Sequence, residues 1–241
     1  MKQTNKVLVF SGAGLSAPSG IPTFRDKDGL WHQHRIEDVA DYTTWKQNFN
    51  LVHEFYNQRR RDLRDVKPNK GHEAIAAWKT TWPNQVDVFT QNVDLCLEAA
   101  GCPDVVHLHG RADLMECTAC GHSWDIGLDP WDYKAGRCPN CNSLRGVKPG
   151  TVFFHQNAPY YSVLYRSVKA ITEHTMVVVV GTSGVVLDVD TLFGHTPGVK
   201  VLNNLEPHPA IDHRRFDHVF FESVETAAPK IDQLVRNHLQ V

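Results

Sequence analysis

Residues 7–16 read Val7-Leu8-Val9-Phe10-Ser11-Gly12-Ala13-Gly14-Leu15-Ser16. The apolar residues at the start of this stretch predict a buried β-strand, and the glycines directly after it predict a tight turn. Such a turn lets the backbone approach a pyrophosphate, whose charge is met by free N–H groups at the start of the following helix. The third glycine of the usual fingerprint is displaced along the chain, to Gly20. The stretch predicts an α/β fold with a dinucleotide site at its first turn.

Further short apolar runs repeat this pattern along the chain. We expect strands at residues 7–10, 86–90, 105–108, 152–154, 176–181, 199–202 and 218–221. Amphipathic stretches such as residues 71–78 and 159–174 separate them and predict helices. Continuous apolar strands that alternate with helices indicate a parallel sheet buried on both faces. The sequence therefore predicts a Rossmann-like, doubly wound α/β core.

Two stretches interrupt this alternation. Residues 111–146 contain cysteine, glycine, aspartate and tryptophan but no apolar run, so we interpret them as a small inserted zinc-ribbon module. Residues 27–70 form a helical insertion, because a long helical stretch from about residue 44 to residue 65 separates the first two strands. We expect the large domain to comprise residues 1–26, 71–110 and 147–241, within one unit that spans residues 1–241.

The cysteines indicate a metal site. Four of the six cysteines form two Cys-x-x-Cys pairs, Cys117 with Cys120 and Cys138 with Cys141, spaced as in a zinc ribbon. Four thiolates fill a tetrahedral zinc and leave no open position, so we predict one structural zinc per chain. The alternative is a pair of disulfides, which a reducing compartment disfavours. Cys96 and Cys102 match no metal pattern.

Composition and charge exclude several classes of protein. The chain has 241 residues and a formal net charge of -2, with a pI near 6.7, so no basic excess points to nucleic acid as the default partner. Residues 1–6 lack an apolar signal core, and no stretch approaches the roughly 18 apolar residues of a membrane span. We expect an unexported, cytoplasmic protein with no membrane partner, and a monomer as its default state.

Several motifs follow one another in a recognisable order. The Gly12-Ala13-Gly14 turn is followed by Ser19-Gly20-Ile21-Pro22 and Phe24-Arg25, and later motifs are Thr90-Gln91-Asn92-Val93-Asp94, Leu108-His109-Gly110, the cysteine pairs, Gly181-Thr182-Ser183 and Asn204-Leu205-Glu206-Pro207. Together they resemble the sirtuin family across nearly the whole chain. The resemblance implies one catalytic unit that uses NAD to remove acyl groups from lysine side chains of proteins or peptides, giving nicotinamide and O-acyl-ADP-ribose.

The resemblance also implies roles for individual residues. His109 is expected to be the general base on a ribose hydroxyl, a task suited to a group that titrates near neutral pH. Asn92 orders the ribose and a water, and Arg25 contacts the reacting groups, so the catalytic set is His109, Asn92 and Arg25. Neighbouring His107 points to the opposite face of its strand, and we interpret it as structural. The cofactor-binding residues that the resemblance implies are Gly12, Ala13, Gly14, Ser16, Ile21, Thr23, Phe24, Arg25, Trp31, Gln91, Asn92, Asp94, Gly181, Thr182, Ser183, Asn204, Leu205, Glu206 and Val224.

The helical insertion carries residues that resemble the acyl pocket of class III sirtuins, which accept acidic acyl groups. Ala40 leaves volume, and Tyr56 and Arg59 are spaced to share one helical face. A hydroxyl and a guanidinium there can bind an acyl carboxylate by charge-assisted hydrogen bonds. The alternative is that Tyr56 only packs and Arg59 belongs to a solvated run of three arginines. The full substrate-binding prediction is Ala40, Tyr56, Arg59, Val152 and Phe154.

Two departures from the family pattern leave other functions open. Residues 153–157 read Phe-Phe-His-Gln-Asn where the family has Phe-Gly-Glu, so His155 adds bulk to the strand that lines the peptide. Residues 184–190 replace a proline-containing loop. If the altered strand does not accept a peptide, the chain could act as an NAD hydrolase or ADP-ribosyltransferase that shares the first chemical step. If Tyr56 and Arg59 are only structural, the alternative is mainly a deacetylase. A non-catalytic interaction module built on the zinc ribbon is disfavoured because Asn92, Asp94 and His109 are present.

Overall fold

The computed structural model describes residues 4–23 and 34–240. Its large sheet has six parallel strands in the order β3-β2-β1-β7-β8-β9. Their bounds are β1 (Lys6–Ser11), β2 (Val86–Thr90), β3 (Val106–His107), β7 (Thr175–Val180), β8 (Val199–Asn204) and β9 (His218–Phe221). The order reverses between β1 and β7, and in such sheets ligands bind outside the carboxyl ends of the strands at that point. The predicted doubly wound core is confirmed.

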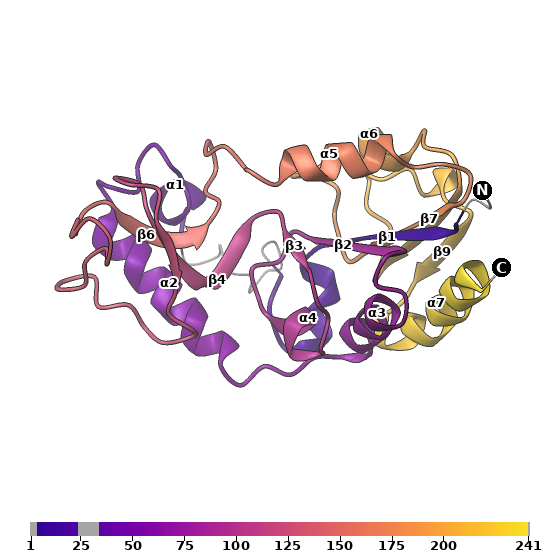
Figure 1. The fold of residues 1–241 in the computed structure, drawn as a ribbon, viewed down its shortest axis with the longest axis horizontal. Coiled ribbons are helices and arrows are strands. Elements are labelled where there is room, and N and C mark those ends of the chain that lie inside the picture. The colour runs from indigo at the N-terminus through magenta and orange to yellow at the C-terminus, as the bar shows by residue number, and fades with distance from the viewer. Residues whose placement is uncertain (1–3, 24–33, 241) are drawn as a thin grey trace.

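Helices cover both faces of this sheet, because alternate residues of β1 are apolar on both sides. Val7 and Val9 pack in one core cluster with α3 (Lys70–Thr81), α4 (Cys96–Ala99) and α7 (Val224–Leu239). Leu8 and Phe10 pack in another cluster with α5 (Tyr161–Lys169) and α6 (Val189–Phe193). Figure 1 shows α5 and α6 on one side of the strands, with α3 and α7 on the other. Among the described helices, none has the length and apolar character needed to cross a membrane.

A second, smaller unit lies at the far end of the molecule (Figure 1). It contains an antiparallel sheet in the order β5-β4-β6, formed by β4 (Gly110–Cys117), β5 (Ser123–Asp125) and β6 (Val147–Thr151). The helices α1 (Ile36–Val39) and α2 (Phe49–Leu63) pack beside it. The long helix of the insertion thus begins at Phe49 rather than near residue 44, since turns occupy the residues before it.

The strand predicted at residues 152–154 is wrong. The strand in this region is β6, which ends at Thr151 and pairs with β4, and Phe154 makes only an isolated bridge to Asp41. The run is apolar because Phe153 is buried against the helical insertion, not because it belongs to the large sheet. Residues 147–151, which the sequence analysis counted with the large domain, lie in the small sheet.

Candidate active site

A cleft of about 2230 Å³ opens at the carboxyl ends of β1, β2, β7 and β8 and extends to α2. The cleft brings together all the described residues that were predicted to bind NAD. These are Gly12, Ala13, Gly14, Ser16, Ile21, Thr23, Gln91, Asn92, Asp94, Gly181, Thr182, Ser183, Asn204, Leu205, Glu206 and Val224. His109 and the predicted acyl-pocket residues Ala40, Tyr56, Arg59, Val152 and Phe154 line the same cleft. Phe24, Arg25 and Trp31 lie outside the described residues.

The glycine turn after β1 packs directly on the turn after β7. The backbone N–H of Gly14 donates to the Gly181 carbonyl over 2.8 Å. Gly181 has φ +64°, and a Cβ on it would lie 2.2 Å from the Leu15 nitrogen, so only glycine fits there. The helix expected directly after the turn is absent among the described residues, where residues 13–19 form two 3₁₀ turns, η1 (Ala13–Leu15) and η2 (Ala17–Ser19). Short 3₁₀ turns, not the start of a helix, therefore line this end of the cleft.

Hydrogen bonds connect the turn after β7 to the end of β8 and to the residue after β2. The Asn204 amide donates to the Thr182 carbonyl over 2.9 Å. The Gln91 amide donates to the Thr182 hydroxyl over 3.0 Å. These bonds join three strand ends that are distant in sequence and so fix the turns that line this side of the cleft.

A buried network of hydrogen bonds joins the turns after β1 and β2 to α3. The Ser16 hydroxyl donates to Asp94 Oδ2 over 2.9 Å and accepts from the Asn92 amide over 3.0 Å. His72 Nε2 lies 3.2 Å from the same hydroxyl. Because the backbone N–H of Asn69 donates to His72 Nδ1, the proton of the neutral ring is on Nε2. His72 and Asn69 are not among the residues predicted from the sequence, although their spacing is that of a capping box at the start of α3.

His72, Asp94 and Cys96 form the second cluster of potential metal ligands among the described residues, since their ligand atoms lie within 4.8 Å of one another. The hydrogen bonds argue against a metal there. His72 Nε2 carries a proton, and burial raises the pKa of the Cys96 thiol. A metal needs neutral imidazole nitrogen and thiolate ligands, so this cluster is a hydrogen-bonded site.

Asn92 makes four hydrogen bonds with its backbone and side chain, and its side-chain Oδ1 remains available to a ligand. Its side-chain amide donates to the Gly12 carbonyl over 3.1 Å and to Ser16, and its backbone N–H donates to the Thr90 hydroxyl. The backbone carbonyl of Asn92 accepts a hydrogen bond from His107 Nδ1 over 2.8 Å. Both amide hydrogens are thus used, and no hydrogen bond from the described residues reaches Oδ1. Asn92 therefore presents a hydrogen-bond acceptor to the cleft.

His109 is placed and polarised as a base. Its Nδ1 lies 3.1 Å from the Gln91 carbonyl, which can only accept, so Nδ1 carries the proton and Nε2 is the acceptor nitrogen of the ring. Burial lowers the pKa of His109, although the hydrogen bond to Gln91 raises it in part. The ring is therefore neutral at neutral pH. His107 does not line the cleft, and its Nε2 lies 2.6 Å from a Glu98 oxygen.

The predicted acyl-pocket residues lie on α2 and beside it. Tyr56 is buried and stacks on Phe153 with ring centroids 5.6 Å apart. Burial raises the pKa of Tyr56 to about 12, so its hydroxyl stays protonated. Arg59 forms an ion pair with Asp62 over 3.0 Å, and its buried Nε has no hydrogen-bond partner among the described residues. The guanidinium thus keeps one donor unsatisfied at the cleft.

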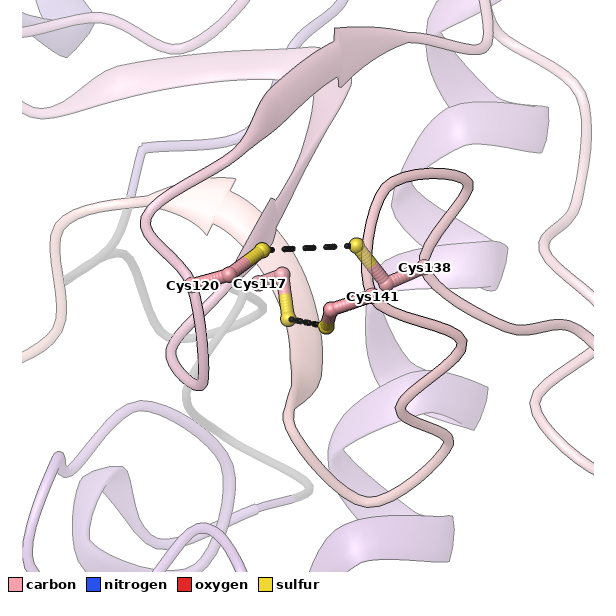
Figure 2. Close-up of side chains that lie close together, drawn as sticks. All are labelled: Cys117, Cys120, Cys138 and Cys141. Atoms are coloured by element: carbon pink, nitrogen blue, oxygen red, sulfur yellow. Dashed lines mark hydrogen bonds between the residues drawn. The ribbon is translucent and has the colours of Figure 1, made fainter.

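The four predicted zinc ligands converge in the small unit. Figure 2 shows the sulfurs of Cys117 and Cys120 facing those of Cys141 and Cys138. The Sγ atoms of Cys117 and Cys141 are 3.6 Å apart, and those of Cys120 and Cys138 are 3.7 Å apart. These separations exceed a disulfide bond of about 2.05 Å. Four sulfurs at about 2.3 Å from a tetrahedral zinc lie about 3.8 Å from one another, so the site fits a structural zinc.

We expect metal analysis of freshly purified, reduced protein to give about one zinc per chain, as one four-thiolate site requires. The double variant Cys96→Ala, Cys102→Ala should retain the same zinc content, because both cysteines are absent from the four-sulfur cluster. A wild-type protein without zinc, or a loss of zinc in this control, would contradict the assignment.

A doubly wound sheet with a glycine turn at its switch point, joined to a four-thiolate module, defines a class of dinucleotide-binding α/β proteins with a structural zinc. Within that class, this chain belongs to the Sir2 family, whose model matches residues 12–188. The resemblance to the sirtuins is thereby confirmed.

Relatives and solved structures agree with this membership. The chain is 39% identical to an NAD-dependent protein deacylase of Helicobacter hepaticus over 248 residues, which cover 95% of this chain and 96% of the relative. It is 38% identical to an NAD-dependent protein deacylase of Campylobacter jejuni, with 97% of each chain covered. A Sir2 homologue in complex with ADP-ribose matches with a TM-score of 0.85 and 30% identity, over 98% of this chain and 94% of that one. A Sir2 homologue in complex with NAD matches with a TM-score of 0.82 and 30% identity, over 98% and 91%.

Proposed function

We propose that this protein is an NAD-dependent protein-lysine deacylase, which transfers an acyl group from lysine to ADP-ribose and releases nicotinamide. The observation that carries the proposal is the single cleft in which a neutral His109, the free acceptor of Asn92 and the acyl-pocket residues meet. The names of the two bacterial relatives support it.

Positioning supplies most of the catalysis in this proposal. Cleavage of the nicotinamide–ribose bond builds positive charge on the ribose, and the acyl-lysine carbonyl oxygen that attacks is a weak nucleophile, so alignment of the two is decisive. Asp94 and Ile21 would hold the nicotinamide carboxamide. The Asp94 carboxylate is fixed from both sides, by the Cys96 backbone N–H over 3.0 Å and by the Ser16 hydroxyl. Asn92 would then order the ribose through its free Oδ1.

His109 would remove the proton from a ribose hydroxyl so that this oxygen can attack the acyl carbon. Its hydrogen bond to the Gln91 carbonyl sets the tautomer that this task requires. The zinc takes no part in these steps. It would join the two cysteine pairs of the small unit, which supports the cleft from the side of α2 and β4.

We further propose that the acyl pocket accepts succinyl and malonyl groups as well as acetyl. The support is the unsatisfied Nε of Arg59 together with the protonated Tyr56 hydroxyl, which can both donate to an acyl carboxylate. Asp62 engages a different nitrogen, Nη2, of the Arg59 guanidinium, so this ion pair does not satisfy the buried Nε. Ala40 is buried beside them and leaves volume for the longer chain.

A second candidate function is NAD hydrolysis or ADP-ribosyl transfer. The observation that favours it is His155, which stands where the family has glycine. This residue has φ +62°, the left-handed conformation that the family's glycine adopts without strain. Its Nδ1 lies 2.9 Å from Asp41 Oδ2, so the ring is anchored to the helical insertion. The added side chain stands at the wall where a peptide would dock, and peptide dependence therefore distinguishes the two functions.

The test is a panel of acetyl-, malonyl-, succinyl- and glutaryl-lysine peptides, each incubated with NAD while nicotinamide release is measured. We expect release to depend on the acyl peptide and to be supported by the acidic acyl groups as well as by acetyl. Release at the same rate without any peptide would identify an NAD hydrolase. Release with acetyl-lysine alone would keep the deacylase function and remove the acidic-acyl proposal.

A further inference from the structure

His109, the base of the proposed reaction, is hydrogen-bonded to a second side chain, Tyr161. This residue is the first of α5 and lines the cleft beside His109. Its hydroxyl lies 2.8 Å from His109 Nε2. Because Nδ1 carries the ring proton, Nε2 is an acceptor, and Tyr161 must donate to it. The lone pair that should receive the substrate proton is therefore already occupied by a tyrosine O–H.

The surroundings of Tyr161 hold this hydroxyl in place. The ring packs against the core cluster that lies beneath α5 and includes Leu164, and it meets Tyr165 edge-on with centroids 6.3 Å apart. These contacts and the hydrogen bond to His109 position the Tyr161 hydroxyl at Nε2. The Tyr161 oxygen, however, retains lone pairs that can accept another hydrogen bond. A substrate hydroxyl can thus reach the base through Tyr161 without displacing it.

We propose that Tyr161 is a further catalytic residue, which relays the proton of the substrate ribose hydroxyl to His109. The substrate O–H bond breaks as its proton passes to the Tyr161 oxygen. The proton that Tyr161 held passes to His109 Nε2, which becomes an imidazolium. The substrate oxygen keeps the electron pair and attacks the acyl carbon, and Tyr161 ends the step neutral. Protons and electrons balance without any further reactant.

The protonation states of both groups suit this relay. Burial raises the pKa of Tyr161, so it is a phenol that can donate and not a phenolate. Burial lowers the pKa of His109, so it is a neutral acceptor. The pKa of His109 is lowered by burial and raised in part by the Gln91 carbonyl. The titratable group that bonds to Nε2 is Tyr161.

The test is Tyr161→Phe, which removes the hydroxyl and keeps the ring in its packing. We expect kcat for deacylation to fall about tenfold, less than the full contribution of a general base because His109 remains. KM for NAD and for the peptide should change less than about twofold, because the phenylalanine ring keeps the packing of the tyrosine ring. The matched control is Tyr165→Phe, one turn along the same helix, which should retain wild-type kcat. An unchanged kcat in Tyr161→Phe overturns the relay, and so does a higher kcat, which would mean that the hydroxyl only obstructs the base.

A second readout does not need activity. A hydrogen bond donated to neutral imidazole favours the neutral form and lowers its pKa, so Tyr161→Phe should raise the pKa of His109 measured by NMR. An unchanged value would contradict the hydrogen bond itself. The relay rests on the proposed function, but different experimental results would contradict the relay and the proposed function. A wild-type protein that releases no nicotinamide with any acyl peptide overturns the function, whereas the ratio of variant to wild type tests only Tyr161.

Discussion

Replacing His109 by alanine should lower deacylation at least ~100-fold, the smallest effect typical of a lost general base. NAD affinity should change little, because most of the residues predicted to bind NAD lie in the turns after β1, β7 and β8. The measurement is steady-state turnover of an acyl-lysine peptide, together with the dissociation constant for NAD. Near wild-type turnover in His109→Ala would remove this residue from the mechanism.

The control for this variant is His218→Ala, since His218 is exposed on β9 and does not line the cleft. Its turnover should equal that of the wild type. The pH profile provides a further check on the wild-type enzyme. Because burial lowers the pKa of His109, the base stays neutral to a lower pH than an exposed histidine would. The acid-side loss of kcat/KM should therefore fall below pH ~6.5, the ordinary histidine value.

Arg59→Met should depress desuccinylation about 30-fold. Removal of the guanidinium leaves the acyl carboxylate without its cation, at a cost of about 2 kcal/mol, and ~1.4 kcal/mol corresponds to a factor of ten in rate. Methionine keeps the apolar stem that packs along α2. Deacetylation places no charge near Arg59 and should fall much less. The measurement is kcat/KM for succinyl- and acetyl-lysine forms of one peptide.

Two companion variants interpret the result. Arg64→Met makes the same substitution at the end of α2, where Arg64 is paired with Asp129 at the surface and does not line the cleft, so both activities should remain. Tyr56→Phe removes only a hydroxyl and should give a smaller loss in the same direction as Arg59→Met. Equal losses of desuccinylation and deacetylation in both pocket variants would mean that Tyr56 and Arg59 are structural.

Much of the fold and the zinc site could be predicted because the signals are local. Two Cys-x-x-Cys pairs carry their ligand geometry in their own spacing, and the four sulfurs do converge. The apolar runs of the large sheet are buried on both faces, which a sequence expresses as unbroken hydrophobicity. The same signal failed at residues 152–154, because burial of Phe153 against α2 and burial in a sheet look alike in sequence.

The hydrogen-bonded parts of the site could not be predicted, because their members are far apart in the chain. Ser16 and His72 are separated by 56 positions, and His109 and Tyr161 by 52. A histidine acquires its tautomer from whichever donor or acceptor the fold brings to each nitrogen, so the position of the proton on His109 depends on Gln91 and Tyr161.

The arginines of α2 separate what sequence and tertiary structure each decide. The sequence by itself determined that Arg59, Arg60 and Arg61 lie on one helix. It also determined the cysteine pairs of the zinc site, the glycine turn and the apolar strands. Only the packing of α2 decided their environments. Arg60 is fully buried and donates to the Ala112 carbonyl over 2.7 Å, while Arg59 lies at the cleft. Consecutive residues of a helix point about 100° apart, so which arginine meets β4 and which meets a substrate depends on the face that the core selects.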